Sequence, residues 1–275
     1  MNVRLICMDM DGTLFGEMGQ VPEINKEALR ACEKMGIKLA LVSGRGYSFI
    51  RRKADEIGIH AAVASANGAR IDDENGNTIF EGVFQKEKGE FIARLLLNEN
   101  VNFEAYTKGR NYIARSELMP DAHKKSLHMY LKAGDVEAIY DDERIVTEAP
   151  ANAYKFVVFS DKASEIDRIR TLLDSLGIKH CSSGSQNVEI MPEGADKGAA
   201  LKRLCDYYHI SPTDTMAFGD YTNDIDMLSA SAHPVAMGNA VDSVKRIAEI
   251  VATLNTEGGL GQVLFAHVIK EMKAQ

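Results

Sequence analysis

A short apolar run that stops at two acidic residues constrains this chain more than any other stretch. Residues 5–14 read Leu-Ile-Cys-Met-Asp-Met-Asp-Gly-Thr-Leu, and the first four predict a buried strand. Because residues two apart share one face of a strand, Asp9 and Asp11 leave it pointing the same way. Gly12 then allows a sharp turn, with its backbone close to any group that the carboxylates hold.

Two like charges at the end of an apolar strand repel one another and raise each other's pKa, and a cation between them removes that penalty. Oxygen ligands of this kind suit a hard ion, and Mg2+ is the first expectation. The alternative is a solvated turn after a strand, since Asp-x-Asp-Gly is common in loops. The rest of the chain has to distinguish these two interpretations.

Strands and helices alternate after this opening. The predicted order is a helix at 22–36, a strand at 37–42, a helix at 47–57 and a strand at 61–64. This alternation indicates a parallel sheet with right-handed crossovers. Ligands of such sheets bind beyond the carboxyl ends of the strands, where Asp9, Asp11 and Ser43 all fall.

The alternation is interrupted between residues 84 and 190. This interval is predicted to hold a helix at 85–98, a hairpin of strands at 101–106 and 111–114, irregular polar sequence to Pro150, a strand at 154–159, a helix at 163–176, and strands at 179–182 and 187–190. Roughly 100 residues can build their own core. We therefore expect a discontinuous core domain of residues 1–83 and 191–275, and an inserted α+β domain of residues 84–190.

The alternation resumes after Pro192. The predicted elements are a helix at 197–208, a strand at 215–218, a helix at 225–230, a strand at 234–236, a helix at 241–247, a strand at 250–251 and a closing helix from Gly261 to about Met272. The predicted fold class is α/β, with a Rossmann-like parallel-sheet core and an inserted α+β cap domain.

Residues far apart in the sequence converge on the carboxyl edge of this sheet. Ser43 and Gly44 offer a hydroxyl and free backbone N–H groups at a helix start, which suit a phosphate. Lys197 supplies a cation at another helix start, and Asp220 and Asp224 bring further carboxylates after a strand. Each has an ordinary explanation alone, as a helix cap or a solvated side chain. Their combination at one edge favours a site.

In this order the residues resemble the haloacid dehalogenase (HAD) superfamily of aspartyl phosphotransferases along the whole chain. Its four motifs are similar to Asp9-Met10-Asp11-Gly12-Thr13, to Ser43, to Lys197, and to Gly219-Asp220 with Asn223-Asp224. The insertion between the second and third motifs is similar to the type IIB α/β cap of the Cof-like branch. Asn67-Gly68-Ala69 and the stretch from Val188 to Gly198 also resemble that branch.

The resemblance implies a role for each acidic residue. Asp9 would be the nucleophile that forms an aspartyl-phosphate, and Asp11 would protonate the leaving alkoxide and then activate water. Mg2+ would be held by Asp9, the backbone carbonyl of Asp11 and Asp220. Asp224 would orient metal-bound waters or Lys197.

The resemblance also implies phosphate contacts from Ser43, the backbone N–H of Gly44, Lys197 and Asn223. We therefore expect an Mg2+-dependent phosphatase that hydrolyses a small phosphorylated metabolite, such as a sugar phosphate, pyridoxal phosphate, or a nucleotide or flavin phosphate. The alternatives are a phosphomutase and a non-catalytic phosphometabolite sensor. A calcium-binding EF-hand is disfavoured, because the residues after Asp11 lack the further ligands and terminal Glu of that loop.

Composition narrows the classes of partner. The net charge is −8, from 32 basic and 40 acidic residues, which argues against a nucleic-acid or anionic-membrane surface. The four cysteines show no metal-ligand spacing, and we find neither a signal-peptide layout nor a run of about 18 apolar residues. We therefore expect a cytoplasmic protein, a monomer or weak homodimer, whose partner is a small phosphorylated metabolite and neither nucleic acid nor membrane.

Overall fold

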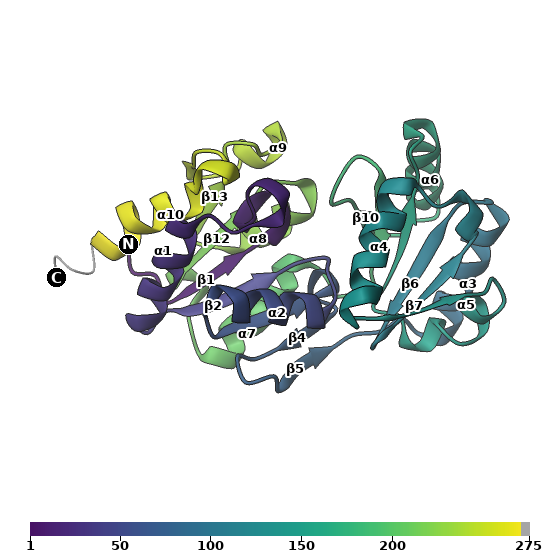
Figure 1. Ribbon diagram of the computed structural model, residues 1–275, viewed down its shortest axis with the longest axis horizontal. Coiled ribbons are helices and arrows are strands. Elements are labelled where there is room, and N and C mark those ends of the chain that lie inside the picture. Colours follow the sequence, from purple (N-terminus) through teal and green to yellow (C-terminus); the bar gives the residue numbers. More distant parts are fainter. Residues whose placement is uncertain (271–275) are drawn as a thin grey trace. The chain divides into compact units, whose positions relative to one another are not determined.

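Two β-sheets organise residues 1–270, which are the residues that the computed structural model describes (Figure 1). Each sheet belongs to its own unit. The core unit comprises Met1–Glu81 and the chain from Asp196 onward, and the inserted unit comprises Gly82–Ala195. The chain therefore leaves the core unit once and returns to it once.

The core sheet contains eight strands within residues 1–270. They are β1 (Leu5–Met8), β2 (Lys38–Val42), β3 (Ala61–Ser65), β4 (Arg70–Asp72), β5 (Thr78–Glu81), β12 (Thr215–Gly219), β13 (His233–Ala236) and β14 (Ile250–Val251). Their order is β14-β13-β12-β1-β2-β3-β4-β5, parallel from β14 to β3 and antiparallel at β4 and β5. The predicted parallel-sheet core is confirmed, and β1 lies near its middle.

Helices cover both faces of the core sheet. One face packs on α1 (Glu23–Lys34), α2 (Tyr47–Ile57) and α10 (Gly259–Leu264), and the other on α7 (Lys197–Tyr208), α8 (Ile225–Ala230) and α9 (Asp242–Lys245). Alternate residues of a strand point to opposite faces. Ile6 and Met8 therefore enter the first hydrophobic core, and Leu5 and Cys7 enter the second. This two-sided burial explains why β1 is apolar at every position.

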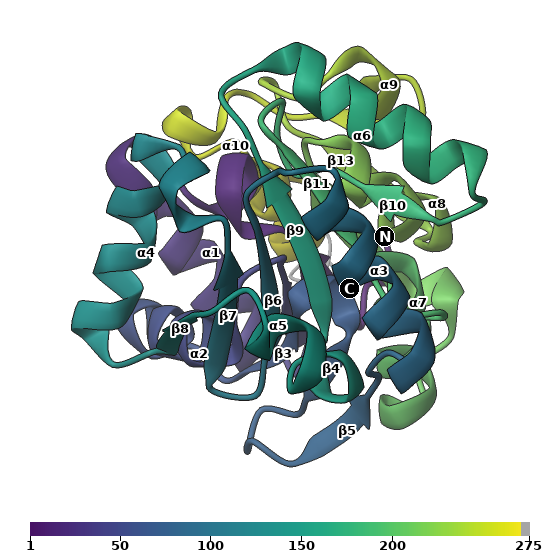
Figure 2. The ribbon, with the colours of Figure 1, turned by 90° about the vertical axis from the view of Figure 1, so that its right-hand side faces the viewer.

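The inserted unit has a sheet of its own (Figure 2). Its strands are β6 (Phe103–Thr107), β7 (Arg110–Ala114), β8 (Glu137–Tyr140), β9 (Lys155–Phe159), β10 (His180–Cys181) and β11 (Asn187–Ile190), in the order β10-β11-β9-β6-β7-β8. One face packs on α3 (Lys86–Asn98), α5 (Arg144–Thr147) and α6 (Ala163–Ser175) around Phe103 and Phe156. On the opposite face, α4 (Asp121–Ala133) contributes Leu127 to a smaller cluster with Ile113 and Met119.

The prediction of irregular sequence up to Pro150 is wrong, because α4, β8 and α5 occupy it. The cause is weak burial. Leu127 is the one buried residue of α4, and Ile139 is the one buried residue of β8. Neither element therefore shows the apolar periodicity from which it could have been predicted. The predicted closing helix begins as α10 and continues as a π-helix at Phe265–Ile269, while its last two residues lie outside the described residues.

The core of the inserted unit gives a stability prediction. The Phe103 side chain is fully buried there, whereas Phe91 on α3 is 51% exposed. We expect Phe103→Ala to lower the free energy of unfolding by about 3–5 kcal/mol through the cavity it leaves. The matched variant Phe91→Ala should change it by less than about 0.5 kcal/mol. Urea unfolding followed by circular dichroism measures both, and equal effects would contradict this account of the core.

Candidate active site

A buried lysine joins two aspartates at the carboxyl edge of the core sheet. Lys197 Nζ lies 2.6 Å from Asp9 Oδ1 and 2.7 Å from Asp224 Oδ1. Only 1% of Lys197 is exposed, and Asp224 is fully buried. Asp9 directly follows β1 and Lys197 is the first residue of α7, so a strand end and a helix start meet here. Three of the predicted site residues are thus in contact.

Local structure fixes the helix start that presents Lys197. Asp196 caps α7, with its side chain accepting a hydrogen bond of 2.7 Å from the Ala199 N–H. At Gly198 a Cβ would lie 2.6 Å from the Asp226 carbonyl oxygen, so only glycine permits this close approach of α7 and α8. The first turn of α7 is thereby held against α8, which follows Asp224 in the chain.

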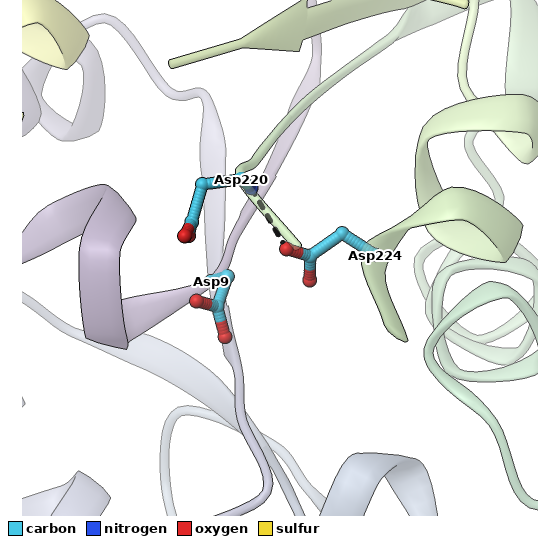
Figure 3. A group of neighbouring side chains, drawn as sticks. All are labelled: Asp9, Asp220 and Asp224. Atoms are coloured by element: carbon cyan, nitrogen blue, oxygen red, sulfur yellow. Dashed lines mark hydrogen bonds between the residues drawn. The ribbon is translucent and has the colours of Figure 1, made fainter. Parts of the chain in front are cut away.

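Asp224 uses both of its carboxylate oxygens within the protein. Oδ1 accepts from Lys197, and Oδ2 accepts from the backbone N–H of Tyr221 at 3.1 Å. Oδ2 also accepts from the backbone N–H of Asp220 at 2.9 Å (Figure 3). Asp224 therefore orients the lysine and closes the loop that carries Asp220. This geometry supports the predicted orienting role.

Asp220 completes an all-oxygen group. One carboxylate oxygen from each of Asp9, Asp220 and Asp224 lies within 4.8 Å of the others (Figure 3). Thr13 Oγ1 donates a hydrogen bond of 2.7 Å to Asp220 Oδ1. Gly12 has a φ of +82°, and a Cβ there would lie 2.3 Å from Asp220 Oδ2, so the turn requires glycine. This donor set fits a hard divalent cation.

The charges of this group are unbalanced. Burial raises the pKa of Asp9 well above its ordinary value, and Asp224, Asp220 and Asp11 add to the rise, while Lys197 opposes it. Burial, with Asp224 and Asp11, raises the pKa of Asp220 to about 6, against the Thr13 hydrogen bond and Lys197.

Lys197 responds in the opposite sense to its surroundings. Burial alone would lower its pKa, but Asp224 and Asp9 outweigh burial and raise it. The lysine therefore stays charged. Its single positive charge can balance only one of the three neighbouring carboxylate charges. Further positive charge at this place would relieve the excess.

Asp11 does not join the buried group. Its side chain is 49% exposed and forms a two-pronged ion pair with Arg45, with Nε at 2.7 Å and Nη2 at 2.6 Å from the two carboxylate oxygens. The Arg45 guanidinium also lies 4.8 Å from the centre of the Phe49 ring. No sequence pattern predicts this pairing, although Asp11 and Arg45 both follow adjacent strands.

Ser43 follows β2 directly and is almost fully buried. Its N–H donates to the Ala64 carbonyl at 2.9 Å, and its Oγ accepts from the Arg45 N–H at 3.3 Å. Within residues 1–270, no hydrogen bond joins Ser43, Gly44 or Asn223 to the acidic group. Their phosphate-binding roles remain predictions.

Two residues near the site had no role in the sequence-based prediction. Thr13 lies inside the first motif and holds Asp220. Asn239 follows β13 and donates a hydrogen bond of 2.8 Å to the Gly12 carbonyl. The edge rule for parallel sheets could have indicated Asn239, because β13 also ends at this edge.

Comparison with known proteins places the chain in a family. The model of the haloacid dehalogenase-like hydrolases matches residues 6–264, and the chain therefore belongs to that family. The resemblance stated from the motifs is confirmed, and the chain is a hydrolase of this family.

The chain is similar to two phosphatases of Bacillus subtilis (strain 168). It is 30% identical to phosphatase YwpJ over 98% of this chain and 100% of that one. It is 28% identical to the 5-amino-6-(5-phospho-D-ribitylamino)uracil phosphatase YwtE over 94% and 96% of the two chains. The solved structure of BT4131, described as a HAD subclass IIB sugar phosphatase, superposes with a TM-score of 0.82 at 21% identity, covering 97% of this chain and 100% of that chain. This likeness confirms the predicted fold class.

The raised pKa of Asp220 predicts a pH-dependent gain from Asp220→Asn in metal-free protein. The ordinary carboxyl pKa applies in the unfolded chain, so ionisation of Asp220 costs stability as pH rises from about 4 through about 6. Asparagine avoids that cost. We expect a gain on the order of 1–3 kcal/mol in the free energy of unfolding at pH 7.5 and little gain at pH 4.5.

Urea unfolding with chelator at the two pH values measures this gain. Asp55→Asn, which replaces an exposed aspartate on α2, is the matched control. A gain from Asp220→Asn that is as large at pH 4.5 as at pH 7.5 would contradict the raised pKa of Asp220.

Proposed function

We propose that this chain is a Mg2+-dependent phosphatase that hydrolyses a small phosphorylated metabolite through an aspartyl-phosphate intermediate. The observation that carries the proposal is the Lys197 ammonium, held between Asp9 and Asp224 at the end of β1. A fixed, buried cation beside a carboxylate at this edge suits the binding of an anionic phosphoryl group. The relatives named as phosphatases support the same activity.

Asp9 is the nucleophile in this proposal. Its carboxylate attacks phosphorus, the bond from phosphorus to the leaving oxygen breaks, and an aspartyl-phosphate forms. Lys197 contacts Asp9 directly and stabilises charge on the phosphoryl oxygens as it redistributes. Ser43, the backbone N–H of Gly44, and Asn223 supply the remaining phosphate contacts.

Asp11 serves as the general acid and base. It gives a proton to the leaving alkoxide and then takes one from the water that hydrolyses the aspartyl-phosphate. Both of its oxygens are engaged by Arg45 in the arrangement described here. Each oxygen accepts one of these hydrogen bonds and keeps a second lone pair, and the Asp11 side chain is 49% exposed.

The buried acids fit the metal that the proposal requires. Asp9, Asp220 and the backbone carbonyl of Asp11 would hold Mg2+, while Asp224 orients Lys197. When bound, Mg2+ would reduce the repulsion between an anionic nucleophile and an anionic phosphate. The shortage of positive charge around these carboxylates supports this assignment.

The substrate is proposed only as a class. YwtE is named for a ribitylamino-uracil phosphate, so a flavin-precursor phosphate or nucleotide stands beside a sugar phosphate and pyridoxal phosphate. In this proposal residues 84–190 act as the cap domain.

Within residues 1–270, every helix is too short or too polar to span a membrane. A cytoplasmic location, a monomer or weak homodimer, and the lack of a nucleic-acid or membrane partner remain predictions.

Phosphate release from these candidate substrates and a generic aryl phosphate tests the proposal. We expect turnover that requires Mg2+, that is lost in Asp9→Asn, and that falls about 10²–10⁴-fold in Asp11→Asn. Asp55→Asn should match the wild type. Turnover that survives Asp9→Asn would refute the aspartyl-phosphate.

The same assay separates the alternatives. A phosphomutase would yield an isomer of the substrate instead of free phosphate. Folded protein that binds one of the phosphates without metal-dependent turnover would favour the sensor.

A further inference from the structure

The segment that carries Asp11 is held by three asparagine side chains. We call Met10–Phe15 the Asp11 turn. Within this turn, the Phe15 N–H donates a hydrogen bond of 2.9 Å to the Met10 carbonyl. Three further carbonyls accept from asparagine amides: Gly12 from Asn239 at 2.8 Å, Leu14 from Asn25 at 3.2 Å and Phe15 from Asn255 at 2.7 Å. We call Asn25, Asn239 and Asn255 the asparagine bracket.

Two of these amides are fixed at both ends. The Asn25 Oδ1 accepts from the Gly261 N–H at 2.8 Å, and the Asn239 Oδ1 accepts from the Asn255 N–H at 3.2 Å. A planar amide with its donor and its acceptor engaged has one orientation. The asparagine bracket therefore connects the Asp11 turn to segments more than 200 residues away in the sequence.

Asn239 also belongs to a closed ring of contacts. It lies in the loop after β13, and in the same loop the Val241 N–H donates to the Asp220 carbonyl at 3.0 Å. Asp220 in turn accepts from Thr13, the residue that follows Gly12. One short loop thus contacts both segments that carry acids of the site.

We propose that Asn239 is a positioning residue that fixes the peptide between Gly12 and Thr13, and with it the placement of Asp11 and Asp220 relative to Asp9. The kinetic part of this proposal rests on the proposed phosphatase function. Asn239 is exposed, whereas Asn25 is fully buried. Loss of the Asn239 amide therefore costs little stability but frees the turn, and a small displacement of reacting groups costs large factors in rate.

Two substitutions isolate the amide donor. Asn239→Asp keeps the shape and the acceptor for the Asn255 N–H, but it places an oxygen against the Gly12 carbonyl. Asn239→Ala removes both contacts. Asn2→Ala is the matched control, because Asn2 is also exposed and donates one long-range hydrogen bond, of 3.1 Å to Asp214 Oδ1.

We expect both Asn239 variants to lower kcat by about 10-fold or more, with KM changed less than about twofold. Asn239→Asp should be the slower of the two. Their melting temperatures should stay close to that of Asn2→Ala, which should keep the wild-type kcat. A merely structural role would instead lower the melting temperature and leave the kcat of folded protein unchanged, and that result would overturn the proposal.

Hydrogen exchange tests the same proposal without turnover. Peptides that cover residues 10–15 should exchange faster in Asn239→Asp than in the wild type and in Asn2→Ala, as followed by mass spectrometry. If the wild type releases phosphate from no substrate, the proposed function fails, and exchange alone decides about Asn239. Wild-type exchange in this turn would then overturn the positioning role.

Discussion

The site depends on one buried ammonium group. Lys197 has no solvent to stabilise its charge, and its ion pairs with Asp9 and Asp224 replace that solvent. Breaking a buried ion pair by removing one partner generally costs about 3–5 kcal/mol, because the other charge stays buried and unpaired. Strand β1, helix α7 and the loop after β12 are therefore coupled through a single side chain, which holds Asp9 in place.

The parallel sheet explains why these residues meet. The carboxyl ends of β1, β2, β12 and β13 lie at one edge because these strands run in the same direction. The segments that leave this edge carry the first motif, Ser43, Asp220 and Asn239. Residues as distant as Gly12 and Asn239 become neighbours without any long loop. The chemistry is thus concentrated where the fold already exposes backbone groups and helix starts.

A helix could be predicted from the sequence where one of its faces is strongly buried at regular spacing. The predicted limits of α7 and α2 match the observed helices, since their buried residues recur with helical spacing. Helix α4 could not be predicted in this way, because Leu127 is its one buried residue. Helix periodicity in a sequence reflects the burial of apolar residues at regular spacing, and one buried residue gives too weak a pattern to predict a helix.

The residues of the site also divide into those that could be predicted from the sequence and those that could not. Asp9, Lys197, Asp220 and Asp224 could be predicted to converge, because each follows a strand or starts a helix. The partner of Asp11 could not, since Arg45 has its own flexible side chain and no fixed spacing from Asp11. The asparagine bracket escaped prediction for a related reason. An asparagine in a loop is ordinary in composition, and its two amide contacts become visible only when the tertiary structure is known.

Neutral amides suit this position for an electrostatic reason. The site already has more negative than positive charge, because the carboxylates of Asp9, Asp220 and Asp224 surround the single ammonium group of Lys197. A lysine or arginine holding the Gly12 carbonyl would add a cation that competes for the same carboxylates. An aspartate or glutamate would add to their repulsion. Asparagine supplies a donor and an acceptor of fixed geometry with no net charge. Asn239 can thereby hold the Gly12 carbonyl without adding charge of either sign to the site.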